Sequence, residues 1–221
     1  MPKEKMNKQT TSITALFLDI GGVLLTNGWD HHARHRAASK FNLDWDEMQD
    51  RHLLNFEIYE EGKVTLEEYM SRVVFYKERA FTPAEFQDFL FAQSEPYAEM
   101  IGLVVHLKVR YGLKVFVVSN EARELNLYRI HKFKLDAFVD AFISSSFVHL
   151  RKPDTEIFRF ALDIAQTPIE QIVFIDNTPM FVQIAQGLGI QSILHTDYAS
   201  TCAKLASFGL HQDDGGIHET R

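Results

Sequence analysis

Five polar residues in this sequence have types and positions that suit phosphate chemistry: Asp19, Ser119, Asn120, Lys152 and Asp176. Each of them follows, or lies near, the end of a short apolar run of strand length. Two carboxylates can bind Mg²⁺ together with water and substrate oxygens, because this hard cation prefers oxygen ligands. A lysine and a hydroxyl group can neutralise and orient phosphate oxygens. The set predicts a site for a phosphate ester, in which Asp19 attacks phosphorus and forms an aspartyl-phosphate intermediate.

Gly21 and Gly22 follow Asp19 with one residue, Ile20, between them. Glycine lets the chain turn tightly and lets backbone groups approach a phosphate closely. The charged residues also have simpler interpretations. Asp19 can end a turn after a strand, Asp176 can cap a helix, and Lys152 can be an ordinary loop lysine. The chemical interpretation therefore depends on all of these residues occurring together at one edge of a sheet.

The chain is expected to bring these residues together because it alternates between strands and helices. Apolar runs of strand length occur at Ile13–Leu18, Lys114–Val118, Ala141–Ile143, Gln171–Ile175 and Gln191–Leu194. They are continuously apolar, which is typical of strands buried on both faces of a parallel sheet. Helical patterns separate them at Ala98–Val109, Ala122–Lys132, Asp154–Ala165 and Pro179–Gly187. The alternation predicts an α/β fold with an open, doubly wound parallel sheet, which binds ligands beyond the carboxyl ends of its strands.

Residues 29–95 interrupt this alternation and predict a helical insert between the first and second strands. The helices are expected at His31–Phe41, Asp44–Glu57, Thr65–Arg79 and Thr82–Gln93. The last two begin with capping boxes, in which a threonine is followed three residues later by a glutamate. An insert at a strand end can form a lid that excludes water. We expect a core domain of residues 13–28 and 96–210, a cap of residues 29–95, and flexible tails at 1–12 and 211–221.

The composition favours a soluble, cytoplasmic protein. The net charge is -7 and no basic run occurs, so neither nucleic acid nor an anionic membrane is an expected partner. The single cysteine, Cys202, cannot form an intrachain disulfide. The polar N-terminus lacks the apolar segment of a signal peptide, and no stretch is long and apolar enough to span a bilayer. The expected partner is a small-molecule phosphate ester, and the sequence does not indicate an oligomeric state.

Four segments, in this order, resemble the motifs of the haloacid dehalogenase (HAD) superfamily. The segments that are similar to motifs I, II, III and IV are, in that order, Ile13–Leu25, Val115–Asn120, Lys152–Phe158 and Val173–Asn177. The resemblance implies a Rossmann-like core with catalytic Asp19 and Lys152. It also implies a phosphate-binding set made of Gly22, Ser119, Asn120 and Lys152. Finally, it implies Mg²⁺ held by Asp19, the carbonyl of Gly21, and Asp176.

The insert stands where the C1 cap stands in the subclass that includes sugar phosphatases and dehalogenases. Its segment Tyr59–Thr65 is similar to that of the branch containing a bacterial glucose-1-phosphate phosphatase. The resemblance therefore implies a phosphatase acting on a small phosphorylated metabolite such as a sugar phosphate.

Two positions depart from the family pattern. Motif I usually has a second Asp, the general acid and base, where this chain has Gly21. A general acid contributes about 10²–10⁴-fold in rate. The glucose-1-phosphate phosphatase branch also has Gly there, and a sugar 1-phosphate expels a comparatively acidic hydroxyl. We therefore expect a preference for such leaving groups. Asn177 stands where an acidic residue is common, which predicts a weaker hold on the metal.

Three other functions compete with this one for the same residues. A haloacid dehalogenase uses an Asp nucleophile on carbon without a metal, but its motif I usually has Tyr in place of Gly21. A phosphomutase is disfavoured because it depends on the missing second Asp. A catalytically weak HAD-fold binding protein is favoured by Gly21 and Asn177. It is disfavoured by Asp19, Lys152 and Asp176, because charged groups in one pocket are costly unless paired or bound to a metal.

Overall fold

The computed structural model describes residues 11–212 of the chain. Its centre is a five-stranded sheet in the order β3-β2-β1-β4-β5, in which every neighbouring pair is parallel. The strands are β1 (Ala15–Leu18), β2 (Lys114–Ser119), β3 (Ala141–Ser144), β4 (Ile172–Asp176) and β5 (Gln191–Leu194). All five predicted strands are present, and the predicted α/β class with a doubly wound parallel sheet is confirmed.

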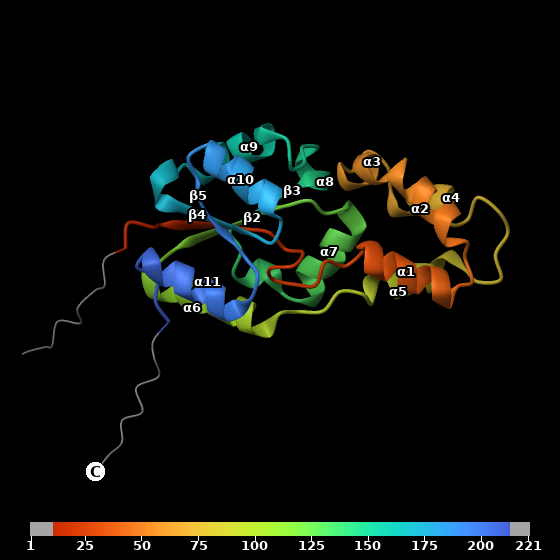
Figure 1. Ribbon diagram of the computed structural model, residues 1–221, viewed down its shortest axis with the longest axis horizontal. Coiled ribbons are helices and arrows are strands. Elements are labelled where there is room, and N and C mark those ends of the chain that lie inside the picture. The colour runs from red at the N-terminus through yellow and green to blue at the C-terminus, as the bar shows by residue number, and fades with distance from the viewer. Residues whose placement is uncertain (1–10, 213–221) are drawn as a thin grey trace, which may run out of the picture.

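Helices cover both faces of the sheet, as Figure 1 shows: α6 and α11 lie on one side, and α9 and α10 on the other. Their bounds are α6 (Ala98–Tyr111), α9 (Thr155–Ala165), α10 (Pro179–Gly187) and α11 (Tyr198–Ser207). Alternate residues of β1 enter two different apolar clusters. Leu16 and Leu18 pack with α6 and α11, while Ala15 and Phe17 pack with α9 and α10. The strand is apolar at every position because both of its faces are buried.

Shorter elements connect the layers. After β2 the chain forms α7 (Arg123–Lys132) and the 3₁₀ turn η1 (Leu135–Ala137), and α8 (Ser145–Val148) follows β3. A second 3₁₀ turn, η2 (Ile169–Gln171), leads into β4. Within residues 11–212, no helix is both long and apolar enough to cross a membrane.

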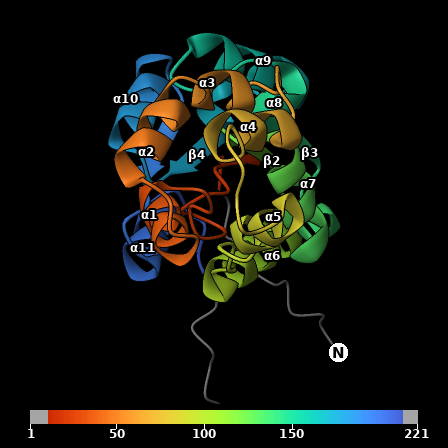
Figure 2. The same cartoon turned by 90° about the vertical axis from the view of Figure 1, so that its right-hand side faces the viewer.

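Between β1 and α6 the chain forms a helical insert of five helices, α1 to α5. They are α1 (His31–Lys40), α2 (Trp45–Leu53), α3 (Phe56–Glu60), α4 (Leu66–Val73) and α5 (Pro83–Phe91). The insert has its own apolar cluster, which the first turn of α7 joins through Ala122 and Leu125. Viewed from its own end, the insert lies in front of the sheet (Figure 2). Both predicted capping boxes, at Thr65 and Thr82, are present.

The insert helices differ in two places from the sequence prediction. The single helix expected over Asp44–Glu57 is broken into α2 and α3, because the Asn55 side chain donates to the carbonyl of Arg51 and ends α2. The helix expected over Thr65–Arg79 ends at Val73. There the Arg79 guanidinium donates to the carbonyl of Val74 at 2.8 Å and replaces the next helical bond.

Two helices, α8 and α11, were not predicted from the sequence, since α11 consists largely of small and hydroxyl residues without a strong apolar stripe. The predicted flexible tails lie mostly outside the described residues. Where they are described, they are bound: Thr11 donates to the carbonyl of Phe208 and His211 donates to the Tyr111 hydroxyl. The exact boundaries between core and insert remain a prediction.

Candidate active site

An Asp–Lys–Asp cluster lies at the carboxyl end of the sheet. Asp19 comes directly after β1 and Asp176 ends β4, and these adjacent parallel strands run in register, so the two carboxylates are neighbours. The Nζ of Lys152 lies 3.2 Å from Asp19 Oδ1 and 2.5 Å from Asp176 Oδ2. All three side chains are buried. The three charged residues that the sequence singled out therefore meet at one point.

The neighbours of this cluster hold it in place. The Asn120 side chain forms two hydrogen bonds with the backbone of Lys152: its Oδ1 accepts from Lys152 N and its Nδ2 donates to Lys152 O, each at 2.8 Å. Ser119, buried at the end of β2, accepts a 3.4 Å hydrogen bond from the backbone of Ile20. The backbone of Thr178 donates to Asp176 Oδ1 at 2.7 Å. The expected contacts of Ser119 and Asn120 with a phosphate stay predictions.

The glycine pair after Asp19 lets the loop close on the next strand end. Gly22 has φ +74°, and a Cβ there would stand 2.0 Å from Nδ2 of Asn177. Asn177 in turn donates to Oδ1 of Asn27 at 3.4 Å. A side chain at position 22 is excluded both by backbone strain and by this close approach.

Burial sets the electrostatics of the cluster. It raises the pKa of Asp19 to about 6, against the lowering effect of the Lys152 ammonium and with the help of the Asp176 charge. Burial by itself lowers the pKa of Lys152, but the two carboxylates more than offset it, and the pKa lies above its usual value. The lysine therefore stays charged and compensates part of the negative charge of the pair.

The donor set suits magnesium. Within residues 11–212 no group of three or more His, Cys, Asp or Glu side chains gathers in a way that could hold a metal ion. Mg²⁺, however, is usually bound by one or two carboxylates, with the remaining positions taken by water and substrate phosphate oxygens. Asp19 and Asp176 offer two adjacent carboxylates at the strand ends, so they fit that requirement.

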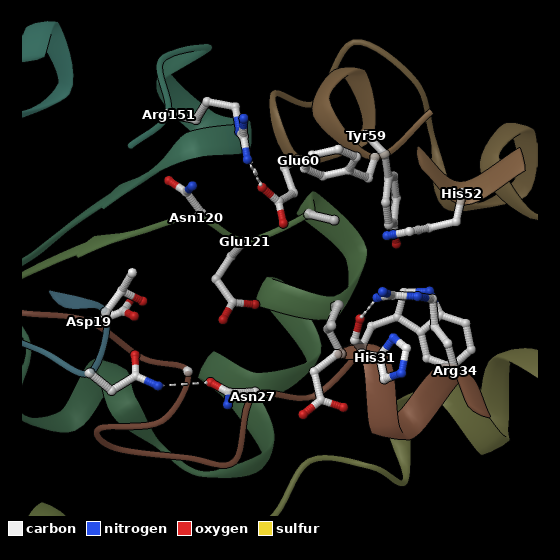
Figure 3. A pocket seen from close by; sticks show the side chains of 18 of the residues that line it. Asp19, Asn27, His31, Arg34, His52, Tyr59, Glu60, Asn120, Glu121 and Arg151 are labelled. Atoms are coloured by element: carbon white, nitrogen blue, oxygen red, sulfur yellow. Dashed lines mark hydrogen bonds and ion pairs between the residues drawn. The ribbon is translucent and has the colours of Figure 1, made fainter. Parts of the chain in front are cut away.

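A cavity of about 520 Å³ opens above this cluster, between the sheet edge and the insert. Figure 3 shows Asp19 on one side of it, and His52 and Tyr59 from the insert on the other. Aromatic and apolar side chains form much of its wall: Trp29, Leu53, Phe56, Tyr59 and Phe181. The cavity is large enough for a small organic phosphate rather than for phosphate alone.

Ion pairs tie the insert to the core at the rim of the cavity. Arg151, the residue before the catalytic lysine candidate, pairs with Glu60 at 2.9 Å and with Glu57 at 3.2 Å. Figure 3 draws the pair with Glu60 as a dashed contact. Gly62 also brings the insert close to the core, because a Cβ there would stand 2.5 Å from the carbonyl of Ser146. The insert thus closes over the strand ends.

The structure adds a buried glutamate that the sequence analysis did not single out. Glu121 lines the cavity with 5% of its surface exposed, and its Oε1 forms a short ion pair with Nη1 of buried Arg129. Burial raises the pKa of Glu121 to about 7, while Arg129 opposes that shift and Asp19 adds to it. Its position directly after Ser119 and Asn120, at a strand end, was the available sequence signal.

The cavity also contains a buried arginine from the insert. Arg34 donates from Nη1 to the carbonyl of Trp29 at 2.8 Å and from Nε to Gln49 at 3.1 Å. It is 8% exposed and lines the cavity opposite the aspartates. No sequence pattern distinguished it, because arginines at helical spacing are common on exposed faces.

The parallel sheet, the helical insert and the Asp–Lys–Asp cluster define an α/β protein with a candidate aspartate nucleophile at its strand ends. Residues 13–189 match the haloacid dehalogenase-like hydrolase family, and the chain belongs to that family. The sequence expectation of a HAD hydrolase is thereby confirmed.

Two curated relatives are fungal. The chain is 26% identical over 192 residues to a drimenol cyclase of Aspergillus calidoustus. The matched region covers 82% of this chain and 34% of the relative. The chain is 30% identical over 111 residues to a sesquiterpene phosphatase of Aspergillus oryzae, covering 50% of this chain and 56% of the relative. The chain thus spans between one third and somewhat over half the length of these relatives.

Solved structures share the fold. A HAD family enzyme from Bacteroides thetaiotaomicron, in complex with magnesium and inorganic phosphate, has a TM-score of 0.71 at 20% identity and covers 86% of this chain and 98% of its own. The L-2-haloacid dehalogenase from Xanthobacter autotrophicus has a TM-score of 0.58 at 16% identity, covering 88% of this chain and 83% of its own.

Proposed function

We propose that this protein is a Mg²⁺-dependent phosphatase that hydrolyses a small phosphate ester through an aspartyl-phosphate on Asp19. The observation that carries the proposal is the Lys152 ammonium, 3.2 Å from Asp19 and 2.5 Å from Asp176 at the base of a cavity. The cluster joins a nucleophile, a cation and a second carboxylate in one buried place. That combination suits the transfer of a negatively charged phosphoryl group.

In this proposal each residue has a defined task. Asp19 forms a bond to phosphorus as the ester oxygen leaves, and water then releases inorganic phosphate and restores the carboxylate. Lys152 neutralises charge on the transferring oxygens and on the aspartates. Ser119 and the backbone at Gly22 are proposed to bind the phosphate oxygens. Asp19, Asp176 and the carbonyl of Gly21 would hold Mg²⁺, whose charge stabilises the equatorial phosphate oxygens when it is bound.

The cavity limits the substrate class. Its volume of about 520 Å³ and the closed contacts of Arg151 with the insert favour a compact ester over a polymer. Sugar phosphates are one candidate class, as the likeness of Tyr59–Thr65 to the sugar phosphatase branch implies. Terpenyl phosphates are the second class. They are favoured by the apolar wall of Trp29, Leu53 and Phe56, and by the likeness of this chain to the fungal sesquiterpene phosphatase.

The test is phosphate release from a panel of sugar phosphates, terpenyl phosphates, nucleotides and an aryl phosphate, with Mg²⁺ and with a chelator. Asp19→Asn is the inactivating variant. Asp163→Asn is its matched control, because Asp163 is an exposed carboxylate of α9 outside the cavity. The proposal predicts metal-dependent turnover in the wild type and in Asp163→Asn, and its loss in Asp19→Asn. The best substrate identifies the class.

The alternative functions give different outcomes in the same experiment. A binding protein would release no phosphate from any ester, yet it would bind Mg²⁺ or a ligand with and without Asp19→Asn. A dehalogenase would release halide from a 2-haloacid in the presence of chelator. Either result would replace the phosphatase proposal.

A further inference from the structure

The Asp–Lys–Asp cluster contains a nucleophile but no evident proton donor for the leaving group. Lys152 contacts both aspartates, and Asp19 is occupied by its own bond to phosphorus during the reaction. An alcohol oxygen that leaves phosphorus needs a proton, and a positioned acid typically contributes about 10²–10⁴-fold. The proton must therefore come from another group on the cavity wall.

Two of those groups have other contacts and lie toward the insert. Asp30 caps α1, since its Oδ1 accepts from Ala33 N at 2.8 Å. His52 bonds through Nδ1 to the Tyr69 hydroxyl at 2.7 Å, and burial lowers its pKa to about 3. Both side chains are therefore already bound to partners in the insert.

Two further groups on the wall, His31 and Tyr59, belong to insert helices, where their rings pack against Trp45 and Tyr69. Glu60 and Glu121 remain, and their partners differ. One oxygen of Glu60 accepts both Nε and Nη2 of Arg151, and this pair belongs to the closure of the insert on the core. Glu121 instead reaches the loop beside the nucleophile. A Cβ built at Gly21 would stand 3.8 Å from Glu121 Oε1 and 3.4 Å from Asn27 Oδ1. The glutamate carboxyl therefore lies next to the space that position 21 leaves open.

The glutamate is also held firmly. Its backbone N donates to Ser145 Oγ at 2.9 Å, and its Oε1 pairs with Arg129. Arg129 is fixed by Ser94 Oγ at 3.0 Å and by the carbonyl of Thr26 at 2.6 Å. Glu121 Oε2 forms no hydrogen bond or ion pair with any residue between 11 and 212, so this oxygen is the one available for proton transfer.

We propose that Glu121 is the general acid and base of this site, in place of a carboxylate at Gly21. The inference rests on the proposed phosphatase function. In the first half of the reaction, Asp19 bonds to phosphorus, the P–O bond to the alcohol breaks, and the proton of Glu121 passes to the leaving oxygen. In the second half, the Glu121 carboxylate takes a proton from water as the water oxygen bonds to phosphorus and the Asp19–phosphorus bond breaks. Inorganic phosphate is released and both side chains return to their starting states.

A purely structural role for Glu121, as the counter-ion of Arg129, gives different kinetics. A structural defect lowers turnover of all esters alike, whereas loss of an acid affects esters according to their leaving group. Aryl phosphates expel an acidic phenol that needs little protonation, and alkyl phosphates expel an alcohol that needs much. The substrate dependence of the defect therefore separates the two roles.

The experiment compares wild type and Glu121→Gln on one aryl and one alkyl phosphate with Mg²⁺. We expect kcat/KM for the alkyl ester to fall by about 10²-fold or more, and kcat/KM for the aryl ester to change by less than about tenfold. Because the base is also lost, the variant should show a burst of phenol followed by slow turnover as the phosphoenzyme accumulates. Equal fold-losses on both esters, or no loss on either, would overturn the proposal.

A second variant tests the same idea by rescue. Gly21→Asp combined with Glu121→Gln places a carboxylate in the adjacent space, where a Cβ meets no atom closer than 3.4 Å. We expect this double variant to regain at least tenfold of the lost alkyl phosphate activity, and a double variant as slow as Glu121→Gln would count against the proposal. If Glu121→Gln does not fold, Glu121→Asp should show the same bias against alkyl esters. Wild type without any Asp19-dependent turnover would instead refute the proposed function itself.

Discussion

The pair of Arg129 and Glu121 makes a strong prediction about stability. Arg129 is fully buried, and its guanidinium bonds to Glu121, to Ser94 Oγ and to the carbonyl of Thr26. Gly28 lies so close that a Cβ there would stand 2.2 Å from Arg129 Nη2. Arg129→Met keeps most of the volume of the side chain but removes every one of these polar contacts.

The expected loss follows from the burial of the pair. Removing one partner of a buried ion pair typically costs about 3–5 kcal/mol, because the other charge is left uncompensated. A chain of this length loses about 2–4 °C in Tm for each kcal/mol. We therefore expect Arg129→Met to lower Tm by roughly 6–20 °C at neutral pH.

The pH dependence of that loss has a defined sign. Without Arg129, burial acts unopposed and holds the pKa of Glu121 above its usual value of 4.5. The unfolded chain then releases this proton from about pH 4.5 upward while the folded chain retains it, so the destabilisation grows as pH rises. At pH 5 the variant should lie closer to the wild type than at pH 8.

The assay is urea unfolding of wild type, Arg129→Met, Glu121→Gln and the double variant. Glu121→Gln in the Arg129→Met background removes the uncompensated charge and should restore part of the loss. The sum of the two losses in unfolding free energy, one for each single variant, should therefore exceed the loss in the double variant. Strict additivity of the two losses, or an Arg129→Met variant as stable as the wild type at pH 8, would refute this account of the pair.

Three further predictions concern other parts of the site. Burial and the charge of Arg34 lower the pKa of His52 to about 3 in the folded protein. Below about pH 6.5 the unfolded chain therefore takes up a proton that the folded chain does not, and stability decreases as the pH decreases. His52→Gln should reduce this fall by up to about 1.4 kcal/mol per pH unit, measured by urea unfolding between pH 7 and pH 5. Gly22→Ala should lower phosphatase activity at least tenfold because of its close approach to Asn177, whereas Gly187→Ala, which meets no atom within 4 Å, should leave kcat unchanged. Gly62→Ala should disturb the contact of the insert with α8, and we expect KM to rise more than kcat falls in steady-state assays. An unchanged KM would show that this contact does not shape the substrate cavity.

Much of the fold could be predicted because its strands are buried on both faces. The run at β1 is apolar at every position, and this pattern located the sheet and its carboxyl edge. Asp19 and Asp176 were then placed together by topology alone, since parallel strands end at one edge. The helix break at Asn55 was not predictable in the same way, because it depends on one side chain bonding to the preceding turn.

Glu121 shows where sequence reasoning ends. The glutamate follows a strand end, which is a weak signal shared by many surface residues. Its position beside Gly21 depends on how the loop after β1 folds back, and its retention in the interior depends on Arg129, eight residues later on α7. Neither the approach of Glu121 to Gly21 nor its pairing with Arg129 can be inferred from the spacing of residues in the sequence. Both contacts depend on the packed structure.

The central claim is that Asp19 is phosphorylated during turnover. The most direct measurement is mass spectrometry of peptides from protein quenched in acid during turnover of an aryl phosphate with Mg²⁺. The account predicts a phosphoryl group on the wild-type peptide that contains Asp19, a larger fraction of it in Glu121→Gln, and none in Asp19→Asn. Turnover that persists in Asp19→Asn, or a phosphoryl group found on another residue, would contradict it.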